Sequence, residues 1–444
     1  MNDELPKGWV WTSLEKCIEV LDNQRNPINA EEREKRINDK DQSKLFPYYG
    51  ATGQVGWIDD YIFDEELILL GEDGAPFLDF SKDKAYLIRG RSWVNNHAHV
   101  LRAIKDISVN SFICHYLNTF DYHNYITGTT RYKLNQSQMR KIMIPVPPLA
   151  EQQRIVNKIE ELFTNLDKGV ESLNLVKYKL KIYRQAILKY AMEGKLTEKW
   201  REENKEEDNL FVYKSEKLNL SLPNSWNRTS LENCVDILDN LRVPVNAEER
   251  QKRIQSKEES ELYPYYGATG QVGWIDDYIF DEELILLGED GAPFLDFTKD
   301  KAYPIKGKSW INNHAHVLRA IENIAINSFI CHYLNTFDYR NYITGTTRYK
   351  LNQAQMRKIM VSLPPLEEQN IIVERIEQLF SLANYIEETV DSKLEQSKKL
   401  RQSILKKAFE GKLVPQDPND EPAEILLERI KIEKSNKGKA IQEK

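Results

Sequence analysis

Three short stretches in the first third of the chain are rich in side chains that can bind nucleic acid. They are residues 127–133 (Thr-Gly-Thr-Thr-Arg-Tyr-Lys), residues 89–97 (Arg-Gly-Arg-Ser-Trp-Val-Asn-Asn-His) and residues 49–54 (Tyr-Gly-Ala-Thr-Gly-Gln). Arg, Lys, hydroxyls and free backbone amides bind phosphates, and Arg, Asn and Gln can make paired hydrogen bonds to base edges. The same compositions are also typical of solvated β-turns, so each stretch has a purely structural interpretation as well.

The chain is a gapless duplication. Adding 217 to a residue number in the first half gives the corresponding residue in the second half. Residues 47–80 recur unchanged as residues 264–297, and residues 124–136 recur as residues 341–353. A period this long indicates a doubled domain, since solenoid repeats are far shorter.

Candidate contact residues therefore form two matched sets. In the first half they are Tyr49, Gly50, Thr52, Gln54, Arg89, Arg91, Ser92, Asn95, Asn96, His97, Thr129, Thr130, Arg131 and Lys133. In the second half they are Tyr266, Gly267, Thr269, Gln271, Lys306, Lys308, Ser309, Asn312, Asn313, His314, Thr346, Thr347, Arg348 and Lys350.

The differences between the two sets separate phosphate contacts from base contacts. Lys306 and Lys308 replace Arg89 and Arg91, and such a replacement suits phosphates better because Lys lacks the planar fork of Arg. We therefore expect base reading from the remaining forked side chains, which are Gln54, Asn95, Asn96 and Arg131. His123, which becomes Arg340 in the second half, could make the two halves unequal.

No residue pattern predicts catalysis or a metal site. His97 and His99 are two residues apart, so they can simply share one face of a strand, and the sequence places no cysteine or acidic partner beside them. Glu193-Gly194-Lys195 resembles the end of one nuclease motif, but it lies at a predicted helix stop, and we attribute it to chance. The chain has no Asn-Pro-Pro-Tyr or Asp-Pro-Pro-Tyr motif for base methylation and no phosphate-binding Gly-x-x-x-x-Gly-Lys-Ser/Thr loop.

In each half of the chain the residue pattern changes once, from short apolar runs to the pattern of a long helix. Short apolar runs such as residues 67–70 and 86–88, broken by Gly, Asn and Asp, predict strands with some helix in residues 1–146. After Pro147-Pro148 the only Gly or Pro before Gly194 is Gly169, which predicts one long helix. Its apolar residues recur at spacings of four and three, as in a coiled coil. At ~1.5 Å per residue the helix would be roughly 65 Å long, and the second copy can supply its partner.

The predicted fold is therefore α+β. Two similar mixed α/β domains are separated by two long antiparallel helices that form a coiled coil, with pseudo-two-fold symmetry. We place the first α/β domain at residues 1–148, the first long helix at 149–196 and a charged linker at 197–221. The second α/β domain follows at 222–365, the second helix at 366–413, and a C-terminal segment with a mobile tail at 414–444.

Composition limits the class of protein. With 41% hydrophobic and 30% charged residues, no apolar run near 18 residues and no secretion signal, the sequence predicts a cytoplasmic protein without a membrane partner. The net charge of −7 disfavours nucleic acid, but it is unevenly spread. Residues 77–146 hold ten Lys or Arg and four Asp or Glu, whereas residues 57–76 hold seven acids and no base. We therefore expect a local basic face.

Several landmarks, taken together, resemble the specificity subunits of Type I restriction–modification systems. Leu5-Pro6-Lys7-Gly8-Trp9 stands near the start, and residues 147–156 (Pro-Pro-Leu-Ala-Glu-Gln-Gln-Arg-Ile-Val) open the long helix. Residues 184–188 and 194–196 close it, and residues 413–418 with 426–430 resemble the family's C-terminal region. The landmarks occur in the family's order and span nearly the whole chain, and the resemblance rests on the whole set.

The resemblance implies two target-recognition domains, each of which reads one half of a split DNA site. It implies a non-catalytic chain without a cofactor of its own. S-adenosylmethionine would bind to two methylation subunits, and ATP and Mg would bind to a separate restriction or motor subunit. The exposed face of the helices, with Gln152, Gln153 and the linker, is the expected dock for the methylation subunits.

The likeness of the two halves departs from the usual family pattern, in which the recognition domains are often unrelated. Two like readers turned by antiparallel helices would fit an interrupted palindrome with the same base pairs in each arm. Two alternatives remain open from the sequence: a stand-alone DNA-acting nuclease, and a coiled-coil adaptor without a role on DNA.

Overall fold

The computed structural model describes residues 5–204, 210–215 and 218–429. The chain divides into two compact units. Unit 1 comprises Met1–Leu173 and Ser392–Lys444, and unit 2 comprises Asn174–Asp391. Each unit thus contains one α/β domain together with part of both long helices. Residues 430–444 of the expected mobile tail lie outside the described residues.

Unit 1 is built on antiparallel sheets with one parallel pair. Its strands are β1 (Val10–Ser13), β2 (Ile18–Val20), β3 (Phe46–Gly50), β4 (Gly53–Ile58), β5 (Phe63–Asp64), β6 (Leu67–Gly71), β7 (Ala85–Ile88), β8 (Arg91–Val94), β9 (Ala98–Ala103) and β10 (Met143–Val146). They form sheets in the orders β2-β9-β6-β7, β4-β3-β8-β5 and β1-β10, and β3 runs parallel to β8. Every residue of β6 is buried, as its unbroken apolar sequence predicts.

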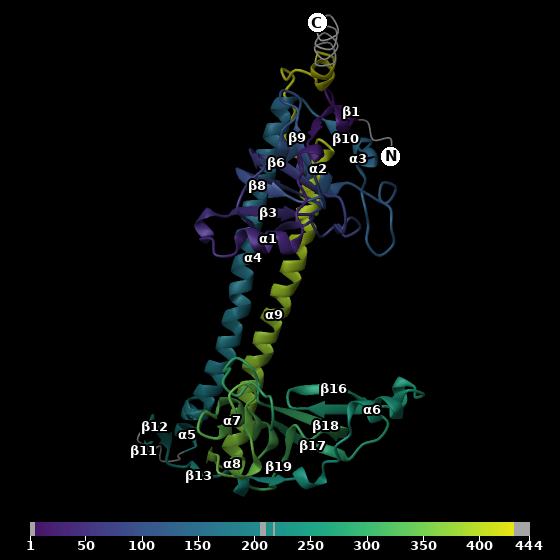
Figure 1. The fold of residues 1–444 in the computed structure, drawn as a ribbon. Coiled ribbons are helices and arrows are strands. Elements are labelled where there is room, and N and C mark those ends of the chain that lie inside the picture. The colour runs from purple at the N-terminus through teal and green to yellow at the C-terminus, as the bar shows by residue number, and fades with distance from the viewer. Residues whose placement is uncertain (1–4, 205–209, 216–217, 430–444) are drawn as a thin grey trace, which may run out of the picture. The chain divides into compact units, whose positions relative to one another are not determined.

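The short helices of unit 1 cover and flank these sheets (Figure 1). They are α1 (Ala30–Ile37), α2 (Asn110–Thr119) and α3 (Gln136–Arg140), with 3₁₀ turns at η1 (Leu14–Lys16), η2 (Asp22–Gln24) and η3 (Gln42–Lys44). α2 buries an apolar face that includes Phe112, Ile113 and Leu117. Asn29 and Asn135 cap α1 and α3 by accepting hydrogen bonds from backbone amides in the first turn.

Unit 2 repeats this architecture. Its strands are β11 (Leu210–Ser215), β12 (Leu218–Pro223), β13 (Asn227–Ser230), β14 (Val235–Ile237), β15 (Tyr263–Gly267), β16 (Gly270–Ile275), β17 (Phe280–Gly288), β18 (Ala302–Ile311), β19 (Ala315–Ala320), β20 (Ile343–Thr344), β21 (Lys350–Leu351) and β22 (Met360–Leu363). Its helices are α5 (Glu198–Glu203), α6 (Ala247–Ile254), α7 (Asn327–Thr336) and α8 (Gln353–Arg357), with 3₁₀ turns at η4 (Lys195–Thr197), η5 (Leu231–Asn233), η6 (Asp239–Leu241) and η7 (Glu259–Glu261). The main sheet is six-stranded, in the order β14-β19-β17-β18-β15-β16, because β17 and β18 are continuous where unit 1 has breaks.

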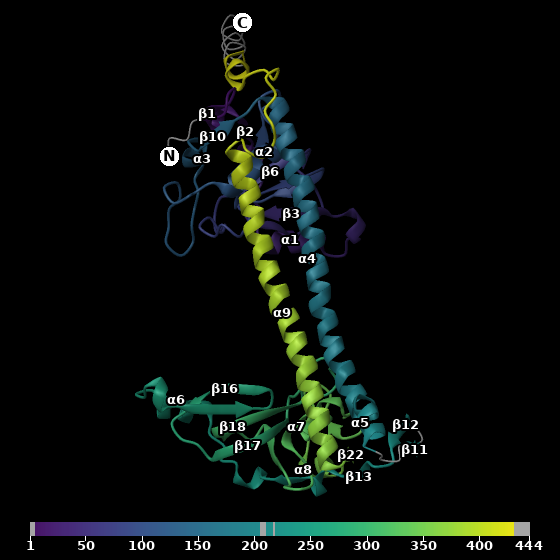
Figure 2. The ribbon, with the colours of Figure 1, turned by 180° about the vertical axis from the view of Figure 1, so that it is seen from behind.

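The two long helices, α4 (Leu149–Met192) and α9 (Leu366–Phe409), lie side by side within each unit, as both ribbon views show (Figures 1 and 2). In unit 1, Ile155 and Ile159 of α4 share a core with Ile404 and Ala408 of α9. In unit 2, Lys177 pairs with Asp391 at 2.7 Å and Arg184 pairs with Glu387 at 2.9 Å. Rising numbers on α4 meet falling numbers on α9, so the helices are antiparallel.

This arrangement confirms the predicted fold class of two mixed α/β domains with long antiparallel helices. Among the residues placed by the structure, no helix has the length and apolar character that a membrane span requires.

Candidate nucleic-acid interface

The three stretches singled out from the sequence meet around one hollow in unit 1, with a volume of about 500 Å³. The β3–β4 turn, the β8–β9 connection and the loop before α3 supply most of its wall. The lining residues are Gly50, Ala51, Val55, Asp73, Gly74, Ala75, Asn95, His97, Thr130, Arg131 and Tyr132. Segments up to 82 residues apart in the sequence therefore form one surface.

Backbone hydrogen bonds hold the walls of this hollow together. Asn95 donates its amide to the carbonyl of Tyr49 at 3.0 Å, and its side-chain oxygen accepts from the amide of His97 at 2.8 Å. The amide of Gly74 donates to the carbonyl of Tyr132 at 2.9 Å. Asn95 is half-buried and has a structural role, because its side-chain oxygen already accepts a hydrogen bond.

Asp73 joins two of the predicted contact residues. Its Oδ1 accepts from Nε of Arg131 at 2.7 Å, and its Oδ2 lies 3.5 Å from Nδ1 of His97. The Arg131 side chain is 63% exposed, whereas that of Asp73 is only 26% exposed. The carboxylate is thus a partly buried anchor for an exposed guanidinium.

Unit 2 has the same arrangement. Asp290 forms an ion pair with Arg348, and its Oδ2 lies 3.6 Å from Nδ1 of His314. Asn312 donates to the carbonyl of Tyr266 at 3.0 Å and accepts from the amide of His314 at 2.8 Å. The two units therefore present matching constellations of side chains.

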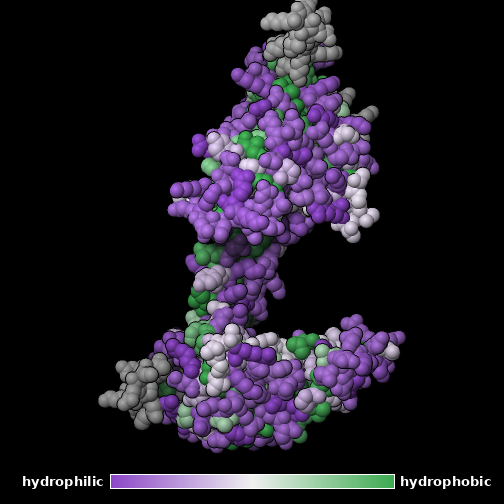
Figure 3. Space-filling view, in the orientation of Figure 1, coloured by the Kyte–Doolittle hydropathy of each residue, from purple (hydrophilic) through white to green (hydrophobic). Residues whose placement is uncertain are grey.

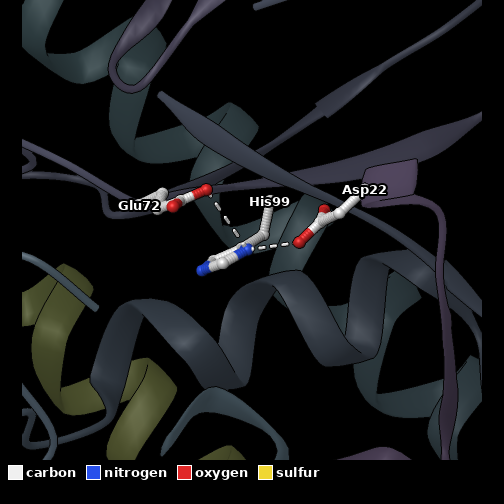
Figure 4. Close-up of side chains that lie close together, drawn as sticks. All are labelled: Asp22, Glu72 and His99. Carbon is white, nitrogen blue, oxygen red and sulfur yellow. Dashed lines mark hydrogen bonds and ion pairs between the residues drawn. The ribbon is translucent and has the colours of Figure 1, made fainter. Parts of the chain in front are cut away.

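Glu72, which precedes Asp73 of the hollow's wall, belongs to a charged network around the buried His99 (Figure 4). Nδ1 of His99 is 2.7 Å from Asp22 and 3.7 Å from Glu72, and its Nε2 is 2.8 Å from the carbonyl of Leu134. Arg25 binds Glu72 at 2.8 Å. Both ring nitrogens of His99 lie within hydrogen-bond distance of oxygen acceptors. Since Leu134 directly follows residues 131–133, the network fixes the base of that loop.

Asp22 is stabilised as a carboxylate within this network. Burial opposes its ionisation, but hydrogen bonds from His99 and from the amide of Val100, together with the charges of His99 and Arg25, outweigh burial and lower its pKa. The set Asp22, Glu72 and His99 has the composition of a metal site. Because hydrogen bonds occupy both nitrogens of the ring, the geometry favours an ion network over metal ligation.

The structure places acidic partners beside these histidines, which the sequence alone did not place there. Asp22 and Glu72 contact His99, and Asp73 lies beside His97. The sequence offered only a weak signal for this, since Asp22 is 77 residues away from His99 and the pairing depends on the chain reversal between η2 and β9.

Burial removes two of the predicted contacts. Ser92 and Ser309 are 0% and 1% exposed because they lie on the inner face of β8 and β18, so their side chains are closed to DNA in this structure. Gly50 and Gly267 are also buried, and Tyr49 and Tyr266 are partly buried. The exposed candidates are Thr52, Gln54, Arg89, Arg91, Asn96, Thr129, Thr130, Arg131, Lys133, Thr269, Gln271, Lys306, Lys308, Asn313, Thr346, Thr347, Arg348 and Lys350.

The expected basic face is wrong for β8 and β9 of unit 1, because the neighbouring acidic stretch neutralises it. Arg89 pairs with Glu66 at 2.7 Å, and Arg91 lies 3.3 Å from Asp64. Arg102 pairs with Glu65 at 2.9 Å. Charges that are segregated along the sequence thus face one another across antiparallel strands. The side of the chain drawn in Figure 3 is mostly hydrophilic, with small apolar patches.

Gln152 was expected on an exposed docking face, and that expectation is also wrong. The side chain is 0% exposed and bonds to Ser108, to the carbonyl of Ile107 and to the carbonyl of Pro147 at 2.8 to 3.1 Å. It therefore anchors the start of α4 to the α/β domain. Gln153, the next residue, is exposed.

Comparison with known proteins assigns the chain to a family. Residues 6–174 and 243–396 match the Type I restriction modification DNA specificity domain, and together they make up more than half of the chain. The chain belongs to this family. All candidate contact residues of this specificity subunit fall within the two matched segments. Specificity subunits select the DNA and leave catalysis to other subunits, which agrees with the prediction of a non-enzymatic chain.

Similar proteins cover three quarters or more of the chain, and solved structures share its fold. The specificity subunit of the type I restriction enzyme EcoDI of Escherichia coli is 26% identical, with 98% of this chain and 97% of that protein covered. The EcoKI specificity subunit of E. coli strain K12 is 28% identical, with 76% and 75% covered. The HsdS subunit of Thermoanaerobacter tengcongensis has a similar fold, with 18% identity, a TM-score of 0.51 and coverage of 93% and 100%. A chain from a study of type I R-M complex assembly has 17% identity, a TM-score of 0.60 and coverage of 92% and 100%.

Proposed function

We propose that this specificity subunit reads a bipartite DNA site whose two arms carry the same short sequence in inverted order. The observation that carries the proposal is the likeness of the two constellations. Asn95 and Asn312 make the same two hydrogen bonds, and the His97–Asp73 and His314–Asp290 separations are 3.5 and 3.6 Å. Like readers select like sequences, and the antiparallel course of α4 and α9 favours inverted arms.

The contacts divide by chemistry. Exposed hydroxyls and amines, such as those of Thr129, Thr130 and Lys308, suit phosphate oxygens. Gln54, Asn96 and Arg131 have exposed forked side chains that suit base edges in the major groove. Binding would weaken steeply with salt, because each phosphate contact releases a counterion.

We propose that the chain works in the cytoplasm as part of an assembly with two methylation subunits on double-stranded DNA. Restriction or motor subunits would join where the system has them. S-adenosylmethionine, ATP and Mg would bind to those partners, and this chain would hold no cofactor. The support is the family membership and the names of the relatives, which are specificity subunits of type I restriction enzymes.

Methylome sequencing tests the proposal directly. A host that carries this chain with its methylation subunits should show adenine methylation at an interrupted palindrome, and deletion of the chain should abolish that methylation. Two unrelated arms would contradict the inverted-repeat proposal. A complex with methylation subunits that shows no sequence preference in mobility-shift assays would contradict the DNA-reading function and favour an adaptor.

A further inference from the structure

The exposed Arg131 uses one side of its guanidinium inside the protein and leaves the other side open. Nε donates to Asp73 at 2.7 Å. Within residues 5–204, 210–215 and 218–429, neither terminal nitrogen of Arg131 makes a hydrogen bond. The side chain is 63% exposed. The free terminal fork therefore presents two parallel donors at the surface.

Two glycines build the turn that carries this arginine. A Cβ on Gly128 would lie 2.4 Å from the carbonyl oxygen of Arg131, and its φ of +92° also favours glycine. Gly74 has a φ of +77°, and Nε of Arg131 lies 3.5 Å from the place of a Cβ there. The Arg131 side chain thus lies across the Gly74 backbone, beside the Asp73 carboxylate that fixes its direction.

Unit 2 repeats the ion pair, the exposure of the arginine and both glycines. Arg348 is 62% exposed and pairs through Nε with Asp290. Gly345 has the same φ of +92°, and a Cβ there would lie 2.4 Å from the carbonyl oxygen of Arg348. Gly291 lies under the guanidinium, as Gly74 does in unit 1. The arrangement is therefore a reproducible feature of the fold.

The carboxylate argues for base reading over phosphate binding. Asp73 compensates much of the charge of Arg131 and would itself repel phosphates, so the pair is a poor phosphate anchor. A carboxylate that holds Nε keeps the directional donors and removes most of the side-chain freedom that Arg would otherwise lose on binding. Two parallel donors match the O6 and N7 acceptors of guanine, whereas adenine presents a donor at one of these places.

We propose that Arg131 and Arg348 each read one guanine from the major groove, at equivalent positions of the two arms, and that Asp73 and Asp290 are their positioning residues. This inference rests on the proposed function, because it assumes that both hollows face DNA.

The test uses the full-length chain in complex with its methylation subunits and a duplex that carries the methylated motif. Each guanine is replaced singly by 7-deazaguanine, which removes the N7 acceptor and keeps base pairing. We expect one guanine per arm at which affinity falls by about 10- to 100-fold. Arg131→Ala should cause a similar loss on unmodified DNA. For the Arg131→Ala complex, 7-deazaguanine in one arm of the DNA should cause no further loss of affinity, because the altered unit can bind that arm.

Arg348→Ala is the matched control and should behave like Arg131→Ala. Asp73→Asn separates positioning from folding. It should raise the affinity for unrelated DNA a few-fold, because a negative charge is lost, and lower the preference for guanine, while the melting temperature stays unchanged. A merely structural role of Asp73 would lower both affinities and the melting temperature, and would overturn its assignment as a positioning residue.

The outcomes distinguish this inference from the proposed function. If no guanine is sensitive to 7-deaza substitution, and Arg131→Ala weakens cognate and unrelated DNA equally, guanine reading is overturned while DNA recognition stands. If the unaltered complex has no sequence preference at all, the proposed function fails first.

Discussion

The same glutamate opens the long helix of each unit but is stabilised differently. Glu151 and Glu368 occupy equivalent positions, and each accepts from a tryptophan, Trp9 at 3.1 Å or Trp226 at 3.0 Å. Glu368 also binds the buried Arg201. Glu151 has an oxygen without a well-placed hydrogen-bond partner, although the side chain of Gln416 approaches the carboxylate. Burial accordingly raises the pKa of Glu151, against the opposing influence of Trp9 and Arg154.

The difference comes from the segment that follows each long helix. In unit 2 this segment forms α5 and brings Arg201 to the helix start, where it is 2% exposed. In unit 1 the equivalent position is Pro418, and the ion pair runs the other way, from Arg154 on the helix to Asp420 at 2.6 Å. In both units an ion pair therefore joins the start of one long helix to the segment that follows the other long helix. The acid lies on the helix in unit 2, whereas the base lies on the helix in unit 1.

Removing the charge of each glutamate should have very different effects on stability in the two units. Glu368→Gln removes the carboxylate of a buried ion pair with Arg201, and we expect a loss of about 3–5 kcal/mol in the free energy of unfolding. Glu151→Gln keeps an acceptor for Trp9 and removes a carboxylate whose pKa is already raised, so we expect a change of about 1 kcal/mol or less. Urea unfolding of both variants at pH 7 measures the difference, and equal losses would contradict it.

A second prediction concerns a feature that both units share. His115 and His332 pack edge-on against Phe163 and Phe380. Desolvation lowers the pKa of each to about 4 from 6.5, helped for His115 by the charge of Arg401. The unfolded chain binds protons below pH 6.5 and the folded chain only near pH 4. Stability is therefore complete above pH 6.5 and falls as the pH decreases toward 4.

This pH dependence should be nearly equal in the two units. At pH 5 each histidine should have cost about 2 kcal/mol of stability relative to pH 7. His115→Gln and His332→Gln should each remove about half of the combined loss, as measured by urea unfolding at pH 7 and pH 5. A variant that lowers stability without changing its pH dependence would show that the histidine is not the titrating group.

The Arg-to-Lys replacements between the two units should cause smaller differences, which appear in DNA binding. Arg89 and Arg91 are ion-paired in unit 1, whereas within the described part of the chain Lys306 has no ion pair and Lys308 only lies over aromatic rings, 4.6 Å from that of Tyr278. Lys306→Ala should lower DNA affinity a few-fold and reduce the slope of log K against log salt by about 0.9.

Arg89→Ala should change that slope less, because Glu66 already balances its charge. Glu66→Gln, which frees Arg89, should make the dependence of log K on log salt steeper and should raise the affinity for DNA. Fluorescence anisotropy titrations from 50 to 200 mM salt would measure all three variants. Identical slopes for Lys306→Ala and Arg89→Ala would show that the ion pair opens when DNA binds.

The duplication, the two long helices, the apolar strands and the family can all be predicted from the sequence, because each depends on local composition or on spacing along the chain. The fully buried β6 and the helix that begins at Leu149 follow from such local patterns. The three stretches around the hollow were also identified by residue type alone.

Which of those side chains are free to bind DNA could not be predicted from the sequence, because it depends on contacts made in the folded chain. Arg131 meets Asp73 across 58 residues of sequence, and Arg89 meets Glu66 across a strand pair. Arg201, in a segment that reads as a charged linker, is buried against Glu368. Ion pairs of this kind depend on chain reversals and strand register, which bring together charges that are distant in sequence. For this reason the predicted basic face consists mostly of ion pairs, and only a few arginine terminal nitrogens and lysines remain available to bind DNA.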